Sequence, residues 1–226
     1  MNLTQKNRIL IFDVETTGLL PKADAPIPDY PYVLQFSFIV FNLLTRNIEK
    51  RHNYYIRVKE DIIIEDKITE ITGITREICD EKGSSIINVI ETFYDCYMLC
   101  DTIIAHNYSF DSKILRTEIQ RNKESLSLCC HNLFNPMFDV EHMIESFCTM
   151  RYGTNICAIM KETENGKSYK KWPTLLELHR HLFNGETPDN LHNSMVDVLV
   201  CLRCYLKMRK QIEISFEEFG QWMSFI

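Results

Sequence analysis

Apolar residues occur along the chain both in short continuous runs and at helical spacing, which indicates a domain of mixed strands and helices. Continuous apolar, aromatic or β-branched runs predict strands at 8–14, 33–43, 53–58 and 101–105. Apolar positions at helical spacing predict helices at 67–75 (ending near Gly73), 84–100, 109–119, 173–184 and 193–210. The alternation of both element types excludes an all-helical or all-strand domain.

Three segments are less regular. Residues 20–31 contain four prolines and are expected to form a loop. Residues 134–147 are interpreted as a strand followed by a helix, and 151–171, which are polar and include Gly153 and Gly166, as a loop or flexible hairpin. The opening strands are joined too closely for helical crossovers, so they are expected to be antiparallel within a mixed sheet.

Composition fits a globular domain. The chain has 226 residues, of which 45% are hydrophobic, and its formal net charge of −6 argues against a protein that coats nucleic acid by bulk attraction. Local cations beside a cleft could still hold a strand end. The start of the chain is polar and the first apolar run stops at Asp13, too short for a signal peptide core or a membrane span. With nine scattered cysteines, we expect an intracellular protein, cytoplasmic or nuclear and not secreted.

Two acids interrupt the first predicted strand. Strand side chains alternate between faces, so Asp13 and Glu15 point to the same side, where like charges repel. A divalent cation bound by both would relieve the repulsion, as would protonation of one of them. Alternatively, both acids lie at an exposed strand end and face water.

Two further acids and one histidine extend this set. Asp111 falls in the first turn of a helix that Ser109 is expected to cap, where the helix dipole by itself favours an acid. Asp197 lies in the apolar helical stretch 195–202, with no lysine or arginine in the preceding turn, and needs a cationic partner unless that helix is less buried than its composition suggests. His192 precedes it by five positions.

With these residues assembled, the chain resembles the DEDD superfamily of 3′–5′ exonucleases, in its histidine-containing (DnaQ-like) branch. Three motifs carry the resemblance, in order: Asp13-Val14-Glu15-Thr16-Thr17-Gly18, His106-Asn107-Tyr108-Ser109-Phe110-Asp111, and His192 followed five positions later by Asp197. Single short motifs recur by chance, but all three occur here on the expected elements. The resemblance spans about residues 8–210, which we assign as an exonuclease domain, with 211–226 as a short C-terminal tail.

The resemblance implies a fold, a reaction and a cofactor. The fold is the ribonuclease H-like α/β three-layer fold, with a mixed five-stranded sheet and flanking helices. The activity is removal of 5′-mononucleotides from the 3′ end of single-stranded or mismatched DNA, with two Mg²⁺ or Mn²⁺ ions per site held by Asp13, Glu15, Asp111 and Asp197. In that scheme Asp13 bridges both ions, Asp111 supports the second, and His192 is the general base, for which its ordinary pKa is suited.

Substrate and partner contacts follow from the same resemblance. Thr16 and Leu19 are expected to contact the terminal nucleotide, with Asn107 and Phe110 as substrate-side neighbours, although Phe110 also fits the helix core. The segment 160–172, with four lysines and two aromatics, could bind phosphates and stack bases or be a solvated loop. Residues 211–216 faintly match a peptide that docks on sliding clamps, so a clamp or a DNA polymerase is a candidate partner; packing of the chain end on the domain is the alternative.

Other functions were weighed on the same residues. An RNA 3′-end trimming enzyme has the same acid set, and one sequence does not reveal a contact to the 2′-hydroxyl. An inactive nucleic-acid-binding or polymerase-accessory module is disfavoured because all four acids and His192 are present. Zinc binding by Cys129-Cys130-His131 or by Cys201 and Cys204 is disfavoured because no second ligand pair stands at matching spacing.

Overall fold

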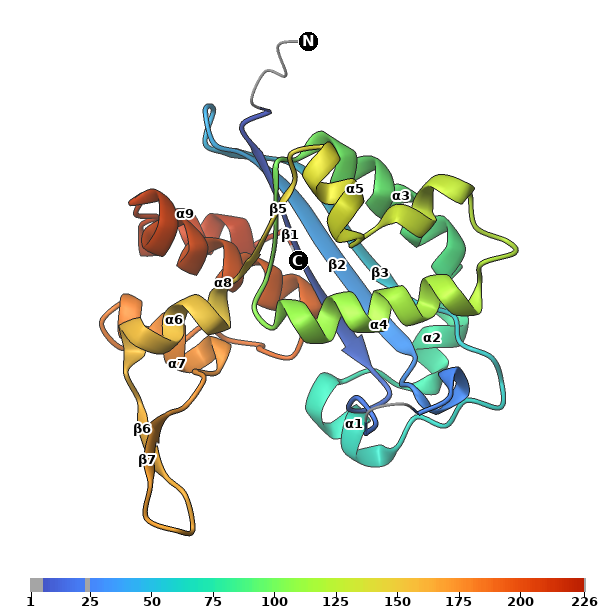
Figure 1. Cartoon of the computed structure of the whole chain (residues 1–226), viewed down its shortest axis with the longest axis horizontal. Helices are drawn as coiled ribbons and strands as arrows, with labels where there is room; N and C mark the ends of the chain where they lie inside the picture. Colours follow the sequence, from blue (N-terminus) through green and yellow to red (C-terminus); the bar gives the residue numbers. More distant parts are fainter. Residues whose placement is uncertain (1–5, 23–24, 226) are drawn as a thin grey trace.

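A five-stranded mixed sheet forms the centre of the computed structural model, which describes residues 6–22 and 25–225 (Figure 1). The polar start 1–5 and residues 23–24 of the expected 20–31 loop lie outside the described residues. The strand order is β3-β2-β1-β4-β5; β2 is antiparallel to β1 and β3, whereas β4 is parallel to β1 and β5. The expected sheet, with its antiparallel opening, is therefore confirmed. The strands are β1 (Arg8–Thr16), β2 (Val33–Asn42), β3 (Asn47–Tyr55), β4 (Thr102–Ala105) and β5 (Glu145–Cys148).

Helices cover both faces of this sheet, and a small hairpin projects to one side (Figure 1). The helices are α1 (Asp66–Thr72), α2 (Arg76–Lys82), α3 (Ile86–Leu99), α4 (Tyr108–Arg121), α5 (Pro136–Glu141), α6 (Thr149–Cys157), α7 (Leu175–Leu182), α8 (Ser194–Tyr205) and α9 (Phe216–Met223). The hairpin is β6 (Met160–Glu162) with β7 (Ser168–Lys170). The short 3₁₀ helices are η1 (Ile27–Asp29) and η2 (Leu128–Asn132), and η3 (Leu206–Lys210) is a π-helix that directly follows α8. None of the helices in the described part is long and apolar enough to cross a membrane.

The alternation of side chains along β1 divides the core into two layers. Leu10, Phe12 and Val14 pack in the cluster that includes residues of α3 and α4. Ile9 and Ile11 pack on the opposite face, in the cluster formed mainly by α8. Residues 13 and 15 share the parity of this second pair, so the sheet itself directs Asp13 and Glu15 toward α8.

Several predicted boundaries were wrong. The third strand covers 47–55 rather than 53–58, because the polar segment Asn47–His52 pairs with β2 as an edge strand. The order within 134–147 is reversed, with α5 preceding β5. Residues 149–157 form α6, so only the hairpin part of the 151–171 prediction is confirmed. Helix α4 begins at Tyr108 with Asn107 as its N-cap, not Ser109.

Candidate active site

The first two acids stand at the end of β1, opposite polar residues of β2. Asp13 pairs with Ser37 and Glu15 with Gln35, and the register shifts directly after Glu15. Directly opposed residues of antiparallel strands point to the same face, so all four side chains are directed toward α8. A register shift of this kind re-aims side chains at the end of a strand.

Gln35 and Ser37 hold the beginning of α8. The Ser194 N–H donates to Gln35 Oε1 at 3.2 Å, and the Ser194 and Ser37 hydroxyls lie 2.6 Å apart. Asn193 caps the helix by accepting from the Met195 N–H at 3.1 Å. Asp197 therefore enters the site from a helix turn that is bonded to the strand next to β1. Gln35 and Ser37 have no role in the sequence-based prediction, although two polar residues spaced by two within an apolar run are a usable signal.

Glu15, His192 and Asp197 meet at one point. One ligand atom from each lies within 4.8 Å of the other two. The His192 backbone N–H donates to Asp197 Oδ2 at 3.3 Å, whereas Asp197 Oδ1 is buried without a hydrogen-bond partner among the described residues. His192 has a φ of 71°, a left-handed conformation that side chains rarely adopt and that often marks functional sites. The structure thus brings together three of the five residues expected at the site.

Asp111 and Asp13 complete the acidic group. Asp111 stands in the first turn of α4 and is only 3% exposed. Its carboxylate receives a backbone hydrogen bond from Val14, which lowers its pKa, while burial and the charge of Asp197 raise it to about 7. Burial, together with Asp111, Asp197 and Glu15, raises the pKa of Asp13 well above its ordinary value. The four carboxylates therefore interact electrostatically even though they come from three separate elements.

Without a cation, this arrangement is costly. Burial, followed by the charges of Asp197 and Asp111, raises the pKa of Glu15 to about 8, and burial raises that of Asp197 to about 7. No lysine or arginine in the described ranges forms an ion pair with any of the four acids. Carboxylate oxygens are the ligands that Mg²⁺ and Mn²⁺ prefer. The donor set and the orphaned Asp197 oxygen thus fit a divalent cation.

The residues expected to contact substrate differ in exposure. Leu19 is 86% exposed, beyond the end of β1. Thr16 is buried, and its hydroxyl donates to the Gly18 carbonyl at 2.6 Å, which tightens the turn after β1. Asn107 stands at the start of α4, and Phe110 is partly buried against the core. The core contact of Phe110 accounts for that side chain without a ligand.

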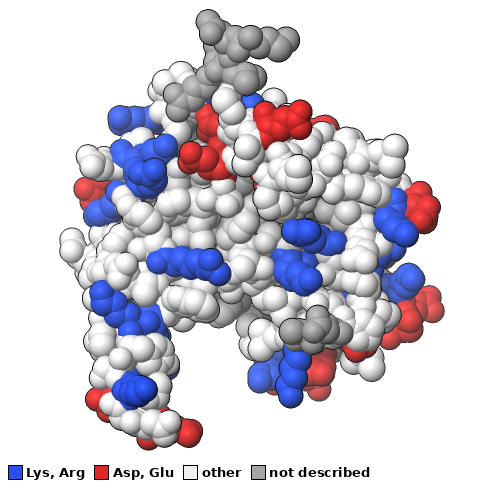
Figure 2. All heavy atoms as spheres, in the orientation of Figure 1, with Lys and Arg blue, Asp and Glu red and all other residues white. Residues whose placement is uncertain are grey.

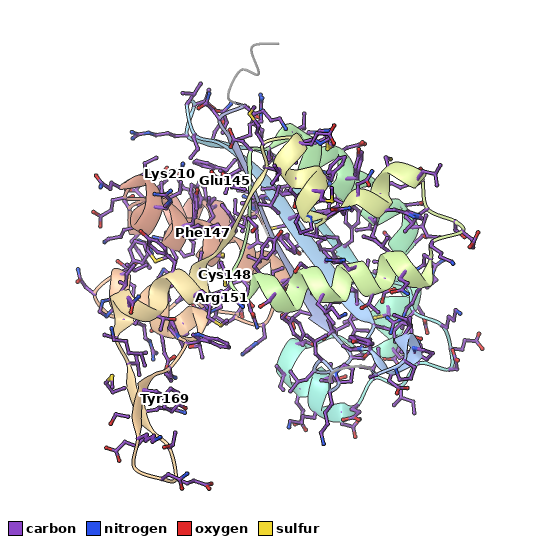
Figure 3. The ribbon with its side chains drawn as sticks, viewed as in Figure 1. Glu145, Phe147, Cys148, Arg151, Tyr169 and Lys210 are labelled. Carbon is purple, nitrogen blue, oxygen red and sulfur yellow. The ribbon has the colours of Figure 1, made fainter. Side chains whose placement is uncertain are left out.

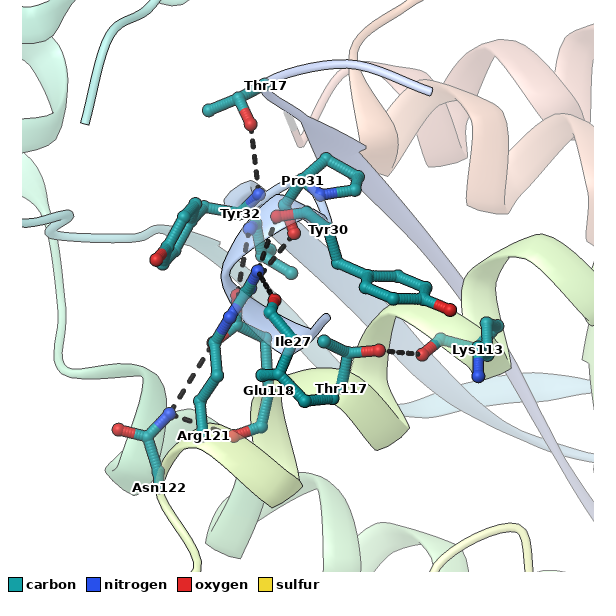
Figure 4. A network of polar contacts seen from close by, with 11 residues as sticks. Thr17, Ile27, Tyr30, Pro31, Tyr32, Lys113, Thr117, Glu118, Arg121 and Asn122 are labelled. Carbon is teal, nitrogen blue, oxygen red and sulfur yellow. Dashed lines mark hydrogen bonds and ion pairs between the residues drawn. The ribbon is translucent and has the colours of Figure 1, made fainter. Parts of the chain in front are cut away.

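The loop that follows Leu19 is attached to α4 (Figure 4). Arg121 donates to the carbonyls of Pro31 and Ile27, both at 3.0 Å, and also to that of Tyr30. Its guanidinium lies 3.8 Å from the centre of the Tyr32 ring and pairs with Glu118 at 2.8 Å. The loop between β1 and β2 is therefore held by the same helix that carries Asp111.

His106 links the end of β4 to the start of α6 and to the segment after β7. Its Nε2 lies 3.1 Å from the Pro173 carbonyl, which can only accept, so Nε2 carries the proton and Nδ1 accepts from Thr149 Oγ1 at 3.0 Å. Burial lowers its pKa to about 4, consistent with a neutral ring. The sequence placed His106 in the second motif without a role; its partners are distant along the chain.

The cysteines do not form an alternative metal site in the described part of the chain. All nine are free thiols, and Cys201 and Cys204 are buried apolar residues of α8. The group of described side chains that could hold a metal ion is Glu15, His192 and Asp197.

Comparison with known proteins identifies a family for most of the chain. Residues 10–205 match the model of the RNase_T family, described as exonuclease. The DNA polymerase III PolC-type of Thermotoga maritima is 33% identical over 112 residues, which are 50% of this chain and 7% of that protein; that of Thermotoga petrophila is 32% identical over the same length and shares. This chain therefore matches only a small part of those relatives.

Solved structures show the same fold at low identity. Escherichia coli Exonuclease I in complex with a dT13 oligonucleotide superposes with a TM-score of 0.62 at 18% identity, covering 91% of this chain and 42% of that one. A 3′-exonuclease described as recognising the 3′ end of a histone mRNA stem-loop gives a TM-score of 0.64 at 15% identity, covering 92% and 84%. The family expected from the three motifs is confirmed: this chain belongs to the exonuclease family.

Proposed function

We propose that this protein is a metal-dependent 3′–5′ exonuclease that releases 5′-mononucleotides from the 3′ end of single-stranded or mismatched DNA. One observation carries the proposal: four carboxylates repel one another, and one of them, Asp197, has a buried oxygen without a partner among the described residues and lies beside His192. Structural acids are normally paired or solvated, so a cluster kept in this state points to a bound cation.

The residues that would hold Mg²⁺ or Mn²⁺ are Asp13, Glu15, Asp111 and Asp197. Two ions bound there would supply Lewis-acid stabilisation to the attacking and leaving oxygens of a phosphoryl displacement. The chain itself contributes rigidity, because Asp13 and Glu15 are on a central strand and Asp197 is on a helix bonded to β2. Such preorganisation keeps the acids converged despite their repulsion.

His192 would take a proton from the attacking water. It is exposed, unlike the four acids, and lies within 4.8 Å of ligand atoms of Glu15 and Asp197. The hydrogen bond between its backbone N–H and Asp197 fixes the position of the base relative to the acids.

Leu19, which is 86% exposed beyond the end of β1, would provide an apolar surface for the terminal base, as the resemblance to the family implies. Thr16, Asn107 and, more weakly, Phe110 are assigned to the substrate side around the same strand and helix ends. We favour DNA because the matched relatives are DNA polymerases and because the Exonuclease I structure holds a dT13 oligonucleotide. Likeness to the histone mRNA 3′-exonuclease keeps RNA trimming as the second candidate.

Association with a polymerase is suggested by the PolC-type relatives. A sliding clamp is less well supported, because Ile214 of the 211–216 segment is buried on the domain, while Phe216 is 66% exposed. We retain the division into a domain of residues 8–210 and a tail of 211–226 as a proposal.

A degradation assay tests the proposed function. The protein is incubated with matched DNA and RNA oligonucleotides, single-stranded or with a mismatched 3′ end, with Mg²⁺, Mn²⁺ or chelator. We expect mononucleotide release from DNA that requires the metal, and a loss on the order of 10³-fold or more in Asp197→Asn.

The matched control is Asp95→Asn, an exposed acid on α3 on the opposite side of the sheet, which should retain activity. Thermal melting of Asp197→Asn without metal should be no lower than that of the unmodified protein, since a repelled charge is removed. Undiminished turnover in Asp197→Asn would refute the assignment.

A further inference from the structure

The β6–β7 hairpin projects from the layered core and has no part in the acid cluster (Figure 1). Its turn is well formed: the Thr163 N–H donates to the Lys167 carbonyl at 2.9 Å, and the Gly166 N–H donates to the Thr163 carbonyl at 2.9 Å. Gly166 has a φ of 73°, which a residue with a side chain rarely adopts. The hairpin is thus a defined structure whose side chains face solvent.

The strand register places the hairpin's Lys161 and its acid Glu162 on opposite faces. Lys161 pairs directly with Tyr169, so the two share one face, and Lys167 has the same parity as Tyr169. The opposite face carries Met160, Glu162 and Lys170, and Glu164 lies in the turn. We call Lys161, Lys167 and Tyr169 the basic face; neither hairpin acid lies on it.

The two lysines of the basic face have no polar partner among the described residues. Lys161 and Lys167 are exposed, and their side chains form no hydrogen bond or ion pair with any described residue. By contrast, Lys170 donates to Asn155 Oδ1 at 3.1 Å, and Lys171 pairs with Glu177 at 2.5 Å. Tyr169 is 47% exposed. Two free ammonium groups and an open ring are therefore available to a ligand.

The base of the hairpin is tied to the candidate active site. His106, five residues before Asp111, bonds both Thr149 at the start of α6 and the Pro173 carbonyl after β7. Arg151 of α6 lies between the start of α4 and the hairpin that carries Tyr169 (Figure 3). In Figure 2, blue side chains follow the hairpin, α6 and α4, whereas red atoms on the hairpin are confined to its tip. The hairpin, α6 and α4 thus carry positive charge on the same face of the molecule.

We propose that the basic face binds a single-stranded polynucleotide upstream of its 3′ end, with Lys161 and Lys167 on phosphates and Tyr169 stacked on a base. This inference rests on the proposed function for the position of the 3′ end. Surfaces that bind single-stranded nucleic acid combine cations that contact phosphates with aromatic rings on which bases stack. The basic face has both. An acidic protein segment would pair with the lysines but would not require the ring beside them.

Binding and hydrolysis are measured separately. Fluorescence anisotropy with labelled dT20, in chelator so that no cleavage occurs, gives the Kd as a function of salt. Lys161→Gln should reduce the slope of log Kd against log salt by about 0.7, the value for one phosphate on a single strand. Tyr169→Ala should raise the Kd about tenfold. The matched controls on the opposite face, Lys170→Gln and Met160→Ala, should leave both quantities unchanged.

The outcomes separate the two proposals. Equal effects of Lys161→Gln and Lys170→Gln, or no effect of either, would overturn the basic face, and so would unchanged binding in Tyr169→Ala. Release of nucleotides from dT4 by the unmodified protein tests the proposed function alone. If the protein releases nucleotides but the basic-face variants bind dT20 as well as the unmodified protein, only the binding role of the basic face is refuted. If the basic-face variants bind more weakly but the unmodified protein releases no nucleotides, only the exonuclease activity is refuted.

Discussion

Asp197 and His192 show how single residues can conflict with their surroundings at a proposed functional site. An apolar helix turn holds a carboxylate with one unpartnered oxygen, and a histidine adopts a backbone conformation suited to glycine. Each is unfavourable for folding alone, on the order of 1–3 kcal/mol. Both side chains converge with Glu15, and the cation site that we propose there would account for this arrangement.

The raised carboxyl pKa values predict the pH dependence of stability. Glu15, Asp111 and Asp197 have pKa values of about 8, 7 and 7, against about 4 in the unfolded chain. Between pH 4 and 8 the metal-free folded state therefore holds more protons, and stability falls as pH rises. We expect the melting temperature without metal to drop from pH 5 to pH 8 by at least about 2–4 °C, roughly 1 kcal/mol for a chain of this size.

Manganese should reverse that loss, because it favours the ionised acids. Melting scans with and without Mn²⁺ should therefore show a gain that grows from pH 5 to pH 8. The pH dependence should be weaker in Asp197→Asn. A melting temperature independent of both pH and metal would contradict the site.

At the scale of elements, the site depends on how strand and helix ends are joined. Asp13 and Glu15 share a face because of strand alternation, which local sequence reveals. Their meeting with Asp197 depends on bonds from Gln35 and Ser37 to the start of α8, nearly 160 residues away in the chain. Likewise, Asn47–His52 becomes a strand only because β2 offers it an edge.

Close packing between Gly83, which directly follows α2, and the segment after β3 gives a prediction at this scale. A Cβ on Gly83 would lie 2.0 Å from the Cys79 carbonyl oxygen and 2.6 Å from the Arg57 nitrogen, both of which are backbone atoms. Gly83→Ala should therefore lower the free energy of unfolding by about 1–3 kcal/mol in urea titration. Gly220→Ala in α9, where a Cβ meets nothing within 4 Å, should be neutral or stabilising by up to about 1 kcal/mol. Similar stability of Gly83→Ala and the unmodified protein would refute this packing.

For the whole molecule, Arg203 connects the last third of the chain. This arginine is 2% exposed and donates to Glu186 Oε2 at 2.6 Å and to the Ile214 carbonyl at 3.0 and 3.2 Å. Its guanidinium also lies 3.9 Å from the centre of the Phe183 ring and 4.7 Å from that of Phe219. One side chain thus joins α8, the loop leading to His192 and the segment leading to α9.

Loss of this connection should destabilise the protein and release its end. Arg203→Met leaves the Ile214 carbonyl and Glu186 without their donor and should cost about 3 kcal/mol of unfolding free energy, the low end for a broken buried pair because Glu186 is a third exposed. Limited proteolysis should cut first near residues 211–215. Arg209→Met, an exposed change in the adjoining turn, is the control. Equal stability of the two variants would contradict this role for Arg203.

The sequence alone determined the family and the existence of most elements, and it supplied the proposed acid set and His192, because these depend on local spacing: period two for Asp13 and Glu15, helical turns for Asp111 and Asp197. Only the tertiary structure decided the third strand, the order of α5 and β5, the hairpin's basic face and the support by Gln35, Ser37 and His106. Those features arise from register and from contacts between distant segments, and the free energy of such contacts is not encoded in any short window of residues.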